Sequence, residues 1–259
     1  MRNDLVLVRG AGRLGSAIAH RLRLAGLPVV MTEAARPTLL HRATCFGTVI
    51  YESELTVDGV PGRRAADAEG LRQLLERGFV PVLSDPPALV REALNPWVLV
   101  DAIGLERNIG TRLTDAPIVI GVGAGFTPGV DVHLVVDPRE GHDLGRLVFD
   151  GALGGTPPAS PTGEPVTRLL RAPAVGRFEP RVRFGQAVAA GETIGQVGSR
   201  PVVTEVAGLV SGLLMEGHFV GAGMRVAEVD PRGDEALLGR IDPRARAVAG
   251  GVLEAILYT

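Results

Sequence analysis

The sequence predicts an α/β protein in which a mainly parallel sheet is followed by a small all-β domain and a terminal helix. Three observations support this fold class. Residues 1–150 alternate between short apolar strands and segments with helical spacing, a pattern typical of parallel sheets. The composition then shifts to Gly, Pro, Ser and Thr over residues 151–164. Residues 165–232 carry short strands punctuated by glycine, with no convincing helix between them.

These observations divide the chain into four parts. Residues 1–150 are expected to form the sheet domain, and 151–164 a linker. Residues 165–232 are expected to form the β domain, and 233–259 a C-terminal helical segment. Within that last segment, apolar spacing over 244–257 predicts a helix that Gly250-Gly251 interrupts.

The first elements form a strand–helix–strand unit. Residues 5–8 are a short apolar run that ends in a glycine turn, as a buried strand would. Residues 15–25 carry apolar side chains at helical spacing, with Gly26 as a stop signal, and 29–32 are a second apolar run.

The remaining elements of the sheet domain follow the same alternation. Residues 48–57 with Asp58-Gly59 and Val60 predict a small inserted hairpin. Helical spacing recurs at 68–77 and 88–94. The other expected strands are 80–83, 97–101, 118–122, 130–136 and 146–149.

The first glycine run has the context of a dinucleotide-binding turn. Gly10 would permit the tight turn, Gly12 would let the backbone approach a pyrophosphate, and Gly15 would let helix and strand pack closely. Glu33 ends the second strand, where an acidic side chain would bond a ribose hydroxyl and favour NAD over NADP. The N-terminal domain is therefore expected to be Rossmann-like and to bind NAD(P) or another nucleotide. The alternative is a tight turn in a domain that has lost its nucleotide.

A second glycine cluster follows the strand at 118–122. Backbone N–H groups around Gly121, Gly123 and Gly125 could form a nest for an anion at the carboxyl edge of the sheet. The alternative is a crowded turn that needs positive φ angles. Two glycine turns in one sheet favour a shared ligand crevice.

Two polar groups are further candidates for the site. Asp101, Asn108, Thr111 and Arg112 follow the fifth strand and would grip a phosphate or a substrate carboxylate; a solvated loop is the alternative. The second group combines a carboxylate with two imidazoles, which could bind a metal or perform acid–base chemistry. Its members are Asp131, His133 and His142. The alternative is that one His is hydrogen-bonded to Asp in the fold and the other His lies in a solvated loop. The identity of a bound metal is unknown.

Composition excludes several functions. The formal net charge of −2 gives no reason to expect nucleic acid or an anionic membrane as a partner. All 27 basic residues are Arg, so lysine chemistry is excluded. Cys45 is the only cysteine, which excludes internal disulfides and suits the cytoplasm, and it is expected to be packed in the core. No apolar run or leader predicts a membrane span or signal peptide.

Two similar halves within the β domain resemble the barrel-sandwich hybrid of lipoyl and biotinyl domains. The first half is carried by residues 172–178 and 188–197, and the second by 206–210 and 220–229. The carrier lysine of those domains has no counterpart here, so lipoyl and biotin are excluded as cofactors. A spacer, dimerisation or partner-docking module is expected, which leaves a homo-oligomer open.

Several segments resemble a known family over nearly the whole chain. They are residues 7–12, 20–22, 108–112, 116–131, 141–146 and 250–256. The chain resembles the YqeB-type accessory proteins of selenium-dependent molybdenum hydroxylases. The resemblance implies a role in inserting or modifying the molybdenum cofactor, a molybdopterin-type ligand and a client molybdenum hydroxylase. Arg13-Leu14-Gly15 departs from the family pattern and makes the glycine motif fuller here.

Three functional hypotheses follow from the sequence. The first, which we favour, is a cytoplasmic maturation factor with a nucleotide-binding domain. The second is an NAD(P)-dependent oxidoreductase with His133 or His142 as its acid–base group. The third is a non-catalytic scaffold with a vestigial nucleotide fold.

Overall fold

The computed structural model describes residues 4–153 and 168–259, which form two compact units. The sheet unit holds described residues 4–37, 44–153 and 241–259. The β unit holds residues 38–43 and 168–240. The C-terminal helix therefore belongs to the sheet unit, and a short segment from the N-terminal part of the chain belongs to the β unit. Part of the expected linker, residues 154–164, lies outside the described residues.

The sheet unit is built on one nine-stranded mixed sheet with the order β3-β4-β5-β2-β1-β6-β7-β8-β9. Strands β4 to β8 in this order run parallel, while β3 and β9 pair antiparallel at the two edges. In sheet order, the strands are β3 (Glu54–Val57), β4 (Val60–Ala65), β5 (Val80–Ser84), β2 (Val29–Glu33), β1 (Val6–Arg9), β6 (Val98–Asp101), β7 (Ile118–Val122), β8 (Leu134–Val136) and β9 (Leu147–Val148).

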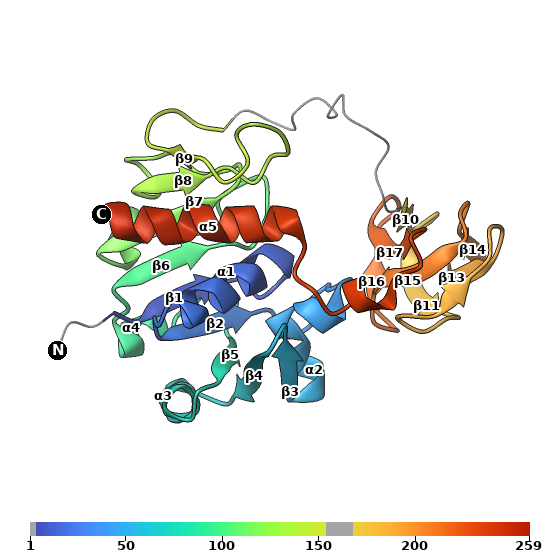
Figure 1. Cartoon of the computed structure of the whole chain (residues 1–259), viewed down its shortest axis with the longest axis horizontal. Helices are drawn as coiled ribbons and strands as arrows, with labels where there is room; N and C mark the ends of the chain where they lie inside the picture. The colour runs from blue at the N-terminus through green and yellow to red at the C-terminus, as the bar shows by residue number, and fades with distance from the viewer. Residues whose placement is uncertain (1–3, 154–167) are drawn as a thin grey trace. The chain divides into compact units, whose positions relative to one another are not determined.

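Helices cover both faces of this sheet. The α-helices are α1 (Arg13–Leu24), α2 (Val49–Glu52), α3 (Ala68–Glu76), α4 (Arg91–Leu94) and α5 (Pro243–Tyr258), with 3₁₀ turns η1 (Arg42–Thr44), η2 (Phe46–Thr48), η3 (Leu113–Asp115) and η4 (Glu235–Leu237). On one face, α1 and α5 lie side by side over the central strands (Figure 1). The other face packs against α3 and the short α4.

The alternation of side chains along each strand explains why both faces are buried. In β1, Val6 and Val8 join the core under α1 and α5, whereas Leu7 joins the core on the opposite face. All three are fully buried, as in a parallel sheet covered on both sides.

Helix α5 is continuous through Gly250 and Gly251, so the expected interruption is wrong. A Cβ atom on Gly251 would lie 2.1 Å from the carbonyl oxygen of Gly145. Gly251 is therefore required for close packing of the helix on the loop after β8, and not for a break.

The β unit contains two four-stranded antiparallel sheets, β10-β17-β15-β12 and β14-β13-β11-β16. Its core is apolar and includes Phe178, Ile194, Val210 and Val226. Each half of the internal repeat lends a short strand to the other half, since β12 pairs with β15 and β16 pairs with β11. The strands are β10 (Arg168–Arg171), β11 (Gly176–Pro180), β12 (Ala187–Val188), β13 (Thr193–Val197), β14 (Arg200–Val203), β15 (Gly208–Leu213), β16 (Phe219–Val220) and β17 (Arg225–Asp230).

The predicted fold class, a Rossmann-like domain with a lipoyl-like domain, is wrong as stated. The large sheet is mixed, with antiparallel strands at both edges. After β5 the connections carry at most the four-residue α4, and the sheet face is covered by α5 from the end of the chain. The second unit is a pair of small antiparallel sheets. The local alternation of strand and helix predicted neither the edges of the sheet nor which helix covers it.

Several local predictions are confirmed. Asp58 and Gly59 both have positive φ angles and join β3 to β4, which is the predicted hairpin. Its first strand is shorter than expected because residues 49–52 form α2.

Over residues 4–153 and 168–259, no helix is both long and apolar enough to cross a membrane.

Candidate functional site

The candidate site lies at the carboxyl edge of the parallel strands. Strands β2, β1, β6, β7 and β8 run in the same direction, so their carboxyl ends meet at one edge of the sheet. Both predicted glycine turns begin there, and so does the polar run that follows Asp101. In open α/β sheets, ligands bind outside this edge.

The first glycine turn is shaped by Gly10 and Gly15. Gly10 has φ +95°, and a Cβ there would lie 2.9 Å from the backbone of Ala102 and Ile103. A Cβ on Gly15 would lie 1.9 Å from the carbonyl oxygen of Gly10. Glycine is required at both positions, so that the turn can close and α1 can pack on β1.

Gly12 caps α1 with an extended backbone and with no side-chain hydrogen bond. The first N–H groups of any helix have no intrahelical acceptor, and they carry the positive end of the helix dipole. Close by, the Arg13 guanidinium donates to the carboxylate of Asp242, the N-cap residue of α5, at 2.6 Å. The turn therefore combines a helix start that has no side-chain cap with a cation.

Glu33 faces back onto the turn. Its two carboxylate oxygens accept from the backbone N–H groups of Ala11, at 2.7 Å, and Ala34, at 2.6 Å. Burial raises the pKa of Glu33 above its ordinary value, and the two backbone hydrogen bonds act in the opposite direction. The side chain predicted to hold a ribose hydroxyl is thus engaged with the glycine turn itself, although each oxygen retains capacity to accept further bonds.

The segment around Cys45 packs over the same turn. The carbonyl oxygen of Ala11 accepts from Gly47 N–H and from the Ser16 hydroxyl, and that hydroxyl accepts from Phe46 N–H. Cys45 is buried, as predicted, and desolvation, with a smaller effect of Glu33, raises its pKa to about 12. A thiol with such a pKa is a packing group and not a nucleophile.

The second glycine turn is filled from within the chain. A Cβ on Gly121 would lie 2.6 Å from the ring of Phe126, and one on Gly125 would lie 2.7 Å from the backbone of Arg107. Gly123 and Gly125 have positive φ angles, and Gly123 N–H donates to the carbonyl of Val136. These contacts occupy part of the space and one of the donors predicted to hold an anion.

The polar run after β6 is partly buried in the fold. Arg9 donates to Asp101 at 3.0 Å and to Thr111 at 2.8 Å, and Thr111 donates to Asp101 at 2.5 Å. All three side chains are buried. The Asn108 side chain organises its own loop, accepting from Gly110 and Thr111 N–H groups, whereas Arg112 is exposed. The hydrogen bonds among Arg9, Asp101 and Thr111 therefore connect this loop to β1 and β6.

The predicted Asp–His–His group is dispersed. Asp131 accepts from Thr127 N–H within its own turn. His133 Nδ1 accepts from Val119 N–H at 2.9 Å, which extends the pairing of β7 and β8. His142 lies exposed in the loop after β8. In the described ranges, no group of three or more His, Cys, Asp or Glu side chains is placed to hold a metal ion.

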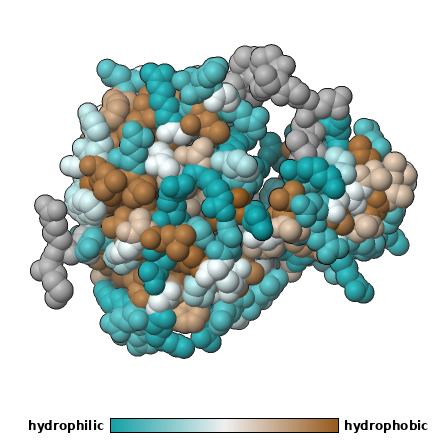
Figure 2. Space-filling model, viewed as in Figure 1, coloured by the Kyte–Doolittle hydropathy of each residue, from teal (hydrophilic) through white to brown (hydrophobic). Residues whose placement is uncertain are grey.

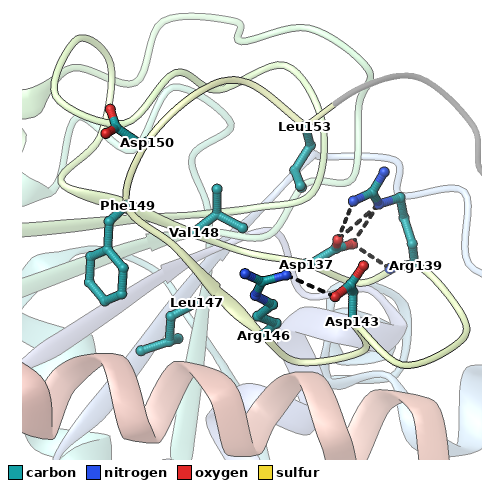
Figure 3. Close-up of a pocket in the computed structure, with 9 residues that line it drawn as sticks. All are labelled: Asp137, Arg139, Asp143, Arg146, Leu147, Val148, Phe149, Asp150 and Leu153. Carbon is teal, nitrogen blue, oxygen red and sulfur yellow. Dashed lines mark hydrogen bonds and ion pairs between the residues drawn. The ribbon is translucent and has the colours of Figure 1, made fainter.

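A hollow of about 410 Å³ beyond β8 was not predicted from the sequence. Its polar end carries Asp137, Arg139, Asp143 and Arg146, and Figure 3 shows Leu153 and Val148 beside the two arginines. Two of these residues belong to the triplet Asp137-Pro138-Arg139, which recurs as Asp230-Pro231-Arg232. In both triplets the arginine donates from Nε and a terminal nitrogen to the aspartate two residues earlier.

Comparison with curated proteins finds a relative that matches nearly the whole chain. No family model matches the chain. It is 37% identical over 257 residues to the uncharacterized protein YqeB of Escherichia coli K12. The match covers 98% of this chain and 48% of YqeB, so the chain spans about half the length of that relative.

Three solved structures of other proteins are partly similar to this chain. A succinylglutamate desuccinylase/aspartoacylase from Rhodobacter sphaeroides has 16% identity and a TM-score of 0.25 over 88% of this chain and 86% of its own. The ectoine utilization protein EutE from Ruegeria pomeroyi has 14% identity and a TM-score of 0.27, covering 87% and 84%. An aspartoacylase family protein from Mesorhizobium loti has 14% identity and a TM-score of 0.26, covering 87% and 83%.

Proposed function

Starting from its sequence relationship to YqeB, we propose that this chain is an accessory factor in the maturation of a molybdenum hydroxylase. In this proposal it binds a phosphate-bearing small molecule at the first glycine turn. The maturation role rests on the sequence resemblance, and the phosphate site rests on the geometry of the turn. The ligand is a nucleotide such as NAD(P), or a molybdopterin-type molecule, because both present a phosphate group.

The observation that carries the phosphate site is the uncapped start of α1. Gly12 offers no side-chain acceptor to the helix, and Gly10 and Gly15 bring the helix start close to the end of β1. Oriented N–H groups at such a position, together with the helix dipole, favour a bound phosphate. The Arg13 guanidinium, although bonded to Asp242, adds positive charge next to these donors.

The surroundings of the turn favour binding over hydride transfer. Glu33 already accepts the Ala11 N–H, so a phosphate would bind to the donors of the following helical residues. The His133 nitrogen that accepts Val119 N–H is engaged in the sheet. Cys45 is held protonated by its burial. Glu33 and Cys45 are therefore hydrogen-bonding and packing groups of the turn, and His133 precedes β8, at the opposite end of the strands.

Two substitutions at Gly12 test the phosphate site. Its backbone angles, φ −76° and ψ −165°, are ones that any residue adopts. Gly12→Asp and Gly12→Asn would both cap α1, but only Asp places a negative charge where the phosphate would bind. With NADH, NADPH and ATP as calorimetric probes, we expect the Asp variant to bind the preferred nucleotide at least about tenfold more weakly than the Asn variant. Equal affinities in the two variants would overturn the phosphate site.

The maturation role needs a separate measurement. A deletion strain should retain the apo-hydroxylase but lose its activity and its bound molybdenum cofactor, and the full chain should restore both. Normal cofactor loading without this protein would overturn that role while leaving the phosphate site intact. Nucleotide binding accompanied by hydride transfer would replace it with an oxidoreductase.

A further inference from the structure

The hollow beyond β8 lies apart from the glycine turn of β1. It is formed by the loop that leaves β8, by β9 and by the residues that follow β9. Gly145 in this loop lies against the backbone of Ala247 and Val248, and Gly251 lies against Gly145, so the loop is fixed on α5. A volume of about 410 Å³ is within the usual range for small-molecule sites.

The charged end of the hollow carries two guanidinium groups, each paired with a carboxylate. The carboxylate of Asp137 is buried, with only 1% of its side chain exposed, whereas its partner Arg139 is 31% exposed. Arg139 binds this carboxylate through Nε and one terminal nitrogen, which leaves its other terminal nitrogen directed elsewhere. The hydrogen bonds to Asp137 raise the pKa of Arg139, so its charge is permanent.

Arg146 supplies the second guanidinium. It donates through one terminal nitrogen to the exposed carboxylate of Asp143, an i,i+3 pair at the surface. Figure 3 shows the arginine side chains of Arg139 and Arg146 at the same end of the hollow, with Asp150 at the other end beyond Val148. Each arginine keeps unused N–H donors, since a guanidinium has five.

Apart from Asp150, the rest of the lining is apolar. Leu147, Val148, Phe149 and Leu153 line the hollow. The ring of Phe149 lies 5.0 Å from that of Tyr258 near the end of α5, and Leu257 beside it is 77% exposed. Figure 2 shows apolar surface around this end of the helix. The hollow thus offers an apolar wall and, at one end, two guanidinium groups.

We propose that this hollow is a binding site for an organic anion with an aromatic or other apolar body. The anionic group, a carboxylate, sulfonate or phosphate, binds to Arg139 and Arg146. The body of the ligand packs against Val148 and Leu153, which lie beside the arginines in Figure 3. This site is independent of the proposed phosphate site at Gly12.

The test uses two fluorescent probes that share a ring system. 8-Anilinonaphthalene-1-sulfonate carries one sulfonate, and N-phenyl-1-naphthylamine is its uncharged counterpart. We expect saturable binding of the sulfonate to the folded full chain at one site, and at least about fivefold weaker binding of the neutral probe. Equal affinities for the two probes would show that the arginines are not used and would overturn the proposal.

Matched variants locate the probe. Arg146→Gln should weaken sulfonate binding about fivefold, whereas Arg72→Gln, which removes a similar exposed i,i+3 pair with Glu69, should not. Arg139→Gln should weaken binding, whereas Arg232→Gln, which breaks the equivalent triplet pair and is not part of the lining, should not. Val148→Phe should abolish binding by filling the hollow. Sulfonate binding unchanged in Arg146→Gln and Val148→Phe would overturn the site even if Arg139→Gln failed to fold.

Discussion

The two glycine turns of the sheet unit have similar sequences but opposite local structures. Both follow a buried parallel strand and begin at the same edge of the sheet. The first opens into the 12-residue α1 and leaves the start of that helix without a side-chain cap. The second opens into no helix, and Phe126 from within the turn packs against Gly121. A glycine run after a strand therefore indicates close packing, and only the next element along the chain decides whether backbone donors are left for a ligand.

The largest expected effect is at Gly15. A Cβ there meets the backbone oxygen of Gly10 at 1.9 Å, so Gly15→Ala must separate α1 from β1. We expect a loss of roughly 4 kcal/mol or more in the free energy of unfolding, measured with urea.

The matched control for Gly15→Ala is Gly250→Ala in α5. Nothing lies within 4 Å of a Cβ at Gly250, so alanine there should stabilise the helix by about 1 kcal/mol. Equal stability of the two variants would contradict the close packing that distinguishes the first turn.

A medium effect is expected at Gly121, where the obstacle is a side chain. Gly121→Ala brings a Cβ to within 2.6 Å of the Phe126 ring and should cost about 1–3 kcal/mol through overpacking. Because a side chain can be shortened, Phe126→Leu should recover part of this loss in the double variant. A double-mutant cycle by urea unfolding measures that coupling, and additive losses would show that Phe126 does not fill the turn.

The sequence predicted the glycines of the site better than it predicted the hydrogen-bond partners of the polar side chains. Gly10 and Gly15 follow from the strand–turn–helix context, because local geometry forces glycine there. Glu33 was expected at the end of β2, but its bond to Ala11 N–H depends on how β2 and the turn pack, which spacing does not reveal. The burial of Asp101 with Arg9 likewise joins residues 92 positions apart.

The hollow beyond β8 shows a different limit of sequence reasoning. The triplet Asp137-Pro138-Arg139 recurs at Asp230-Pro231-Arg232, and in both places the arginine pairs with the aspartate two residues earlier. A third copy, Asp242-Pro243-Arg244, behaves differently because Asp242 caps α5 and Arg244 donates to the carbonyl of Pro138. The same three residues therefore give a self-paired loop or a helix start, depending on whether the next residues continue as loop or helix.

The smallest expected effect concerns Glu33 and pH, and it tests whether this side chain belongs to the first turn. The pKa of Glu33 is raised in the folded protein above its ordinary value of 4.5. In the pH range between these two values the folded state holds more protons than the unfolded state, so stability falls as pH rises. The contribution is most favourable below pH 4.5, and the penalty is complete above the raised pKa.

Glu33→Gln removes this titration while keeping the shape of the side chain. We expect the unfolding free energy of the wild type, relative to the variant, to decrease as pH is raised through this window. The variant itself should show a constant loss, because its amide can offer an acceptor to only one of the Ala11 and Ala34 N–H groups. Urea unfolding at a series of pH values from acid to neutral measures both quantities.

A difference that grows in the wild type's favour with pH would mean that the carboxylate is stabilised by the turn more than it is penalised by burial. Glu33 would then already act as the anion of the first glycine turn, and a phosphate would have to displace it.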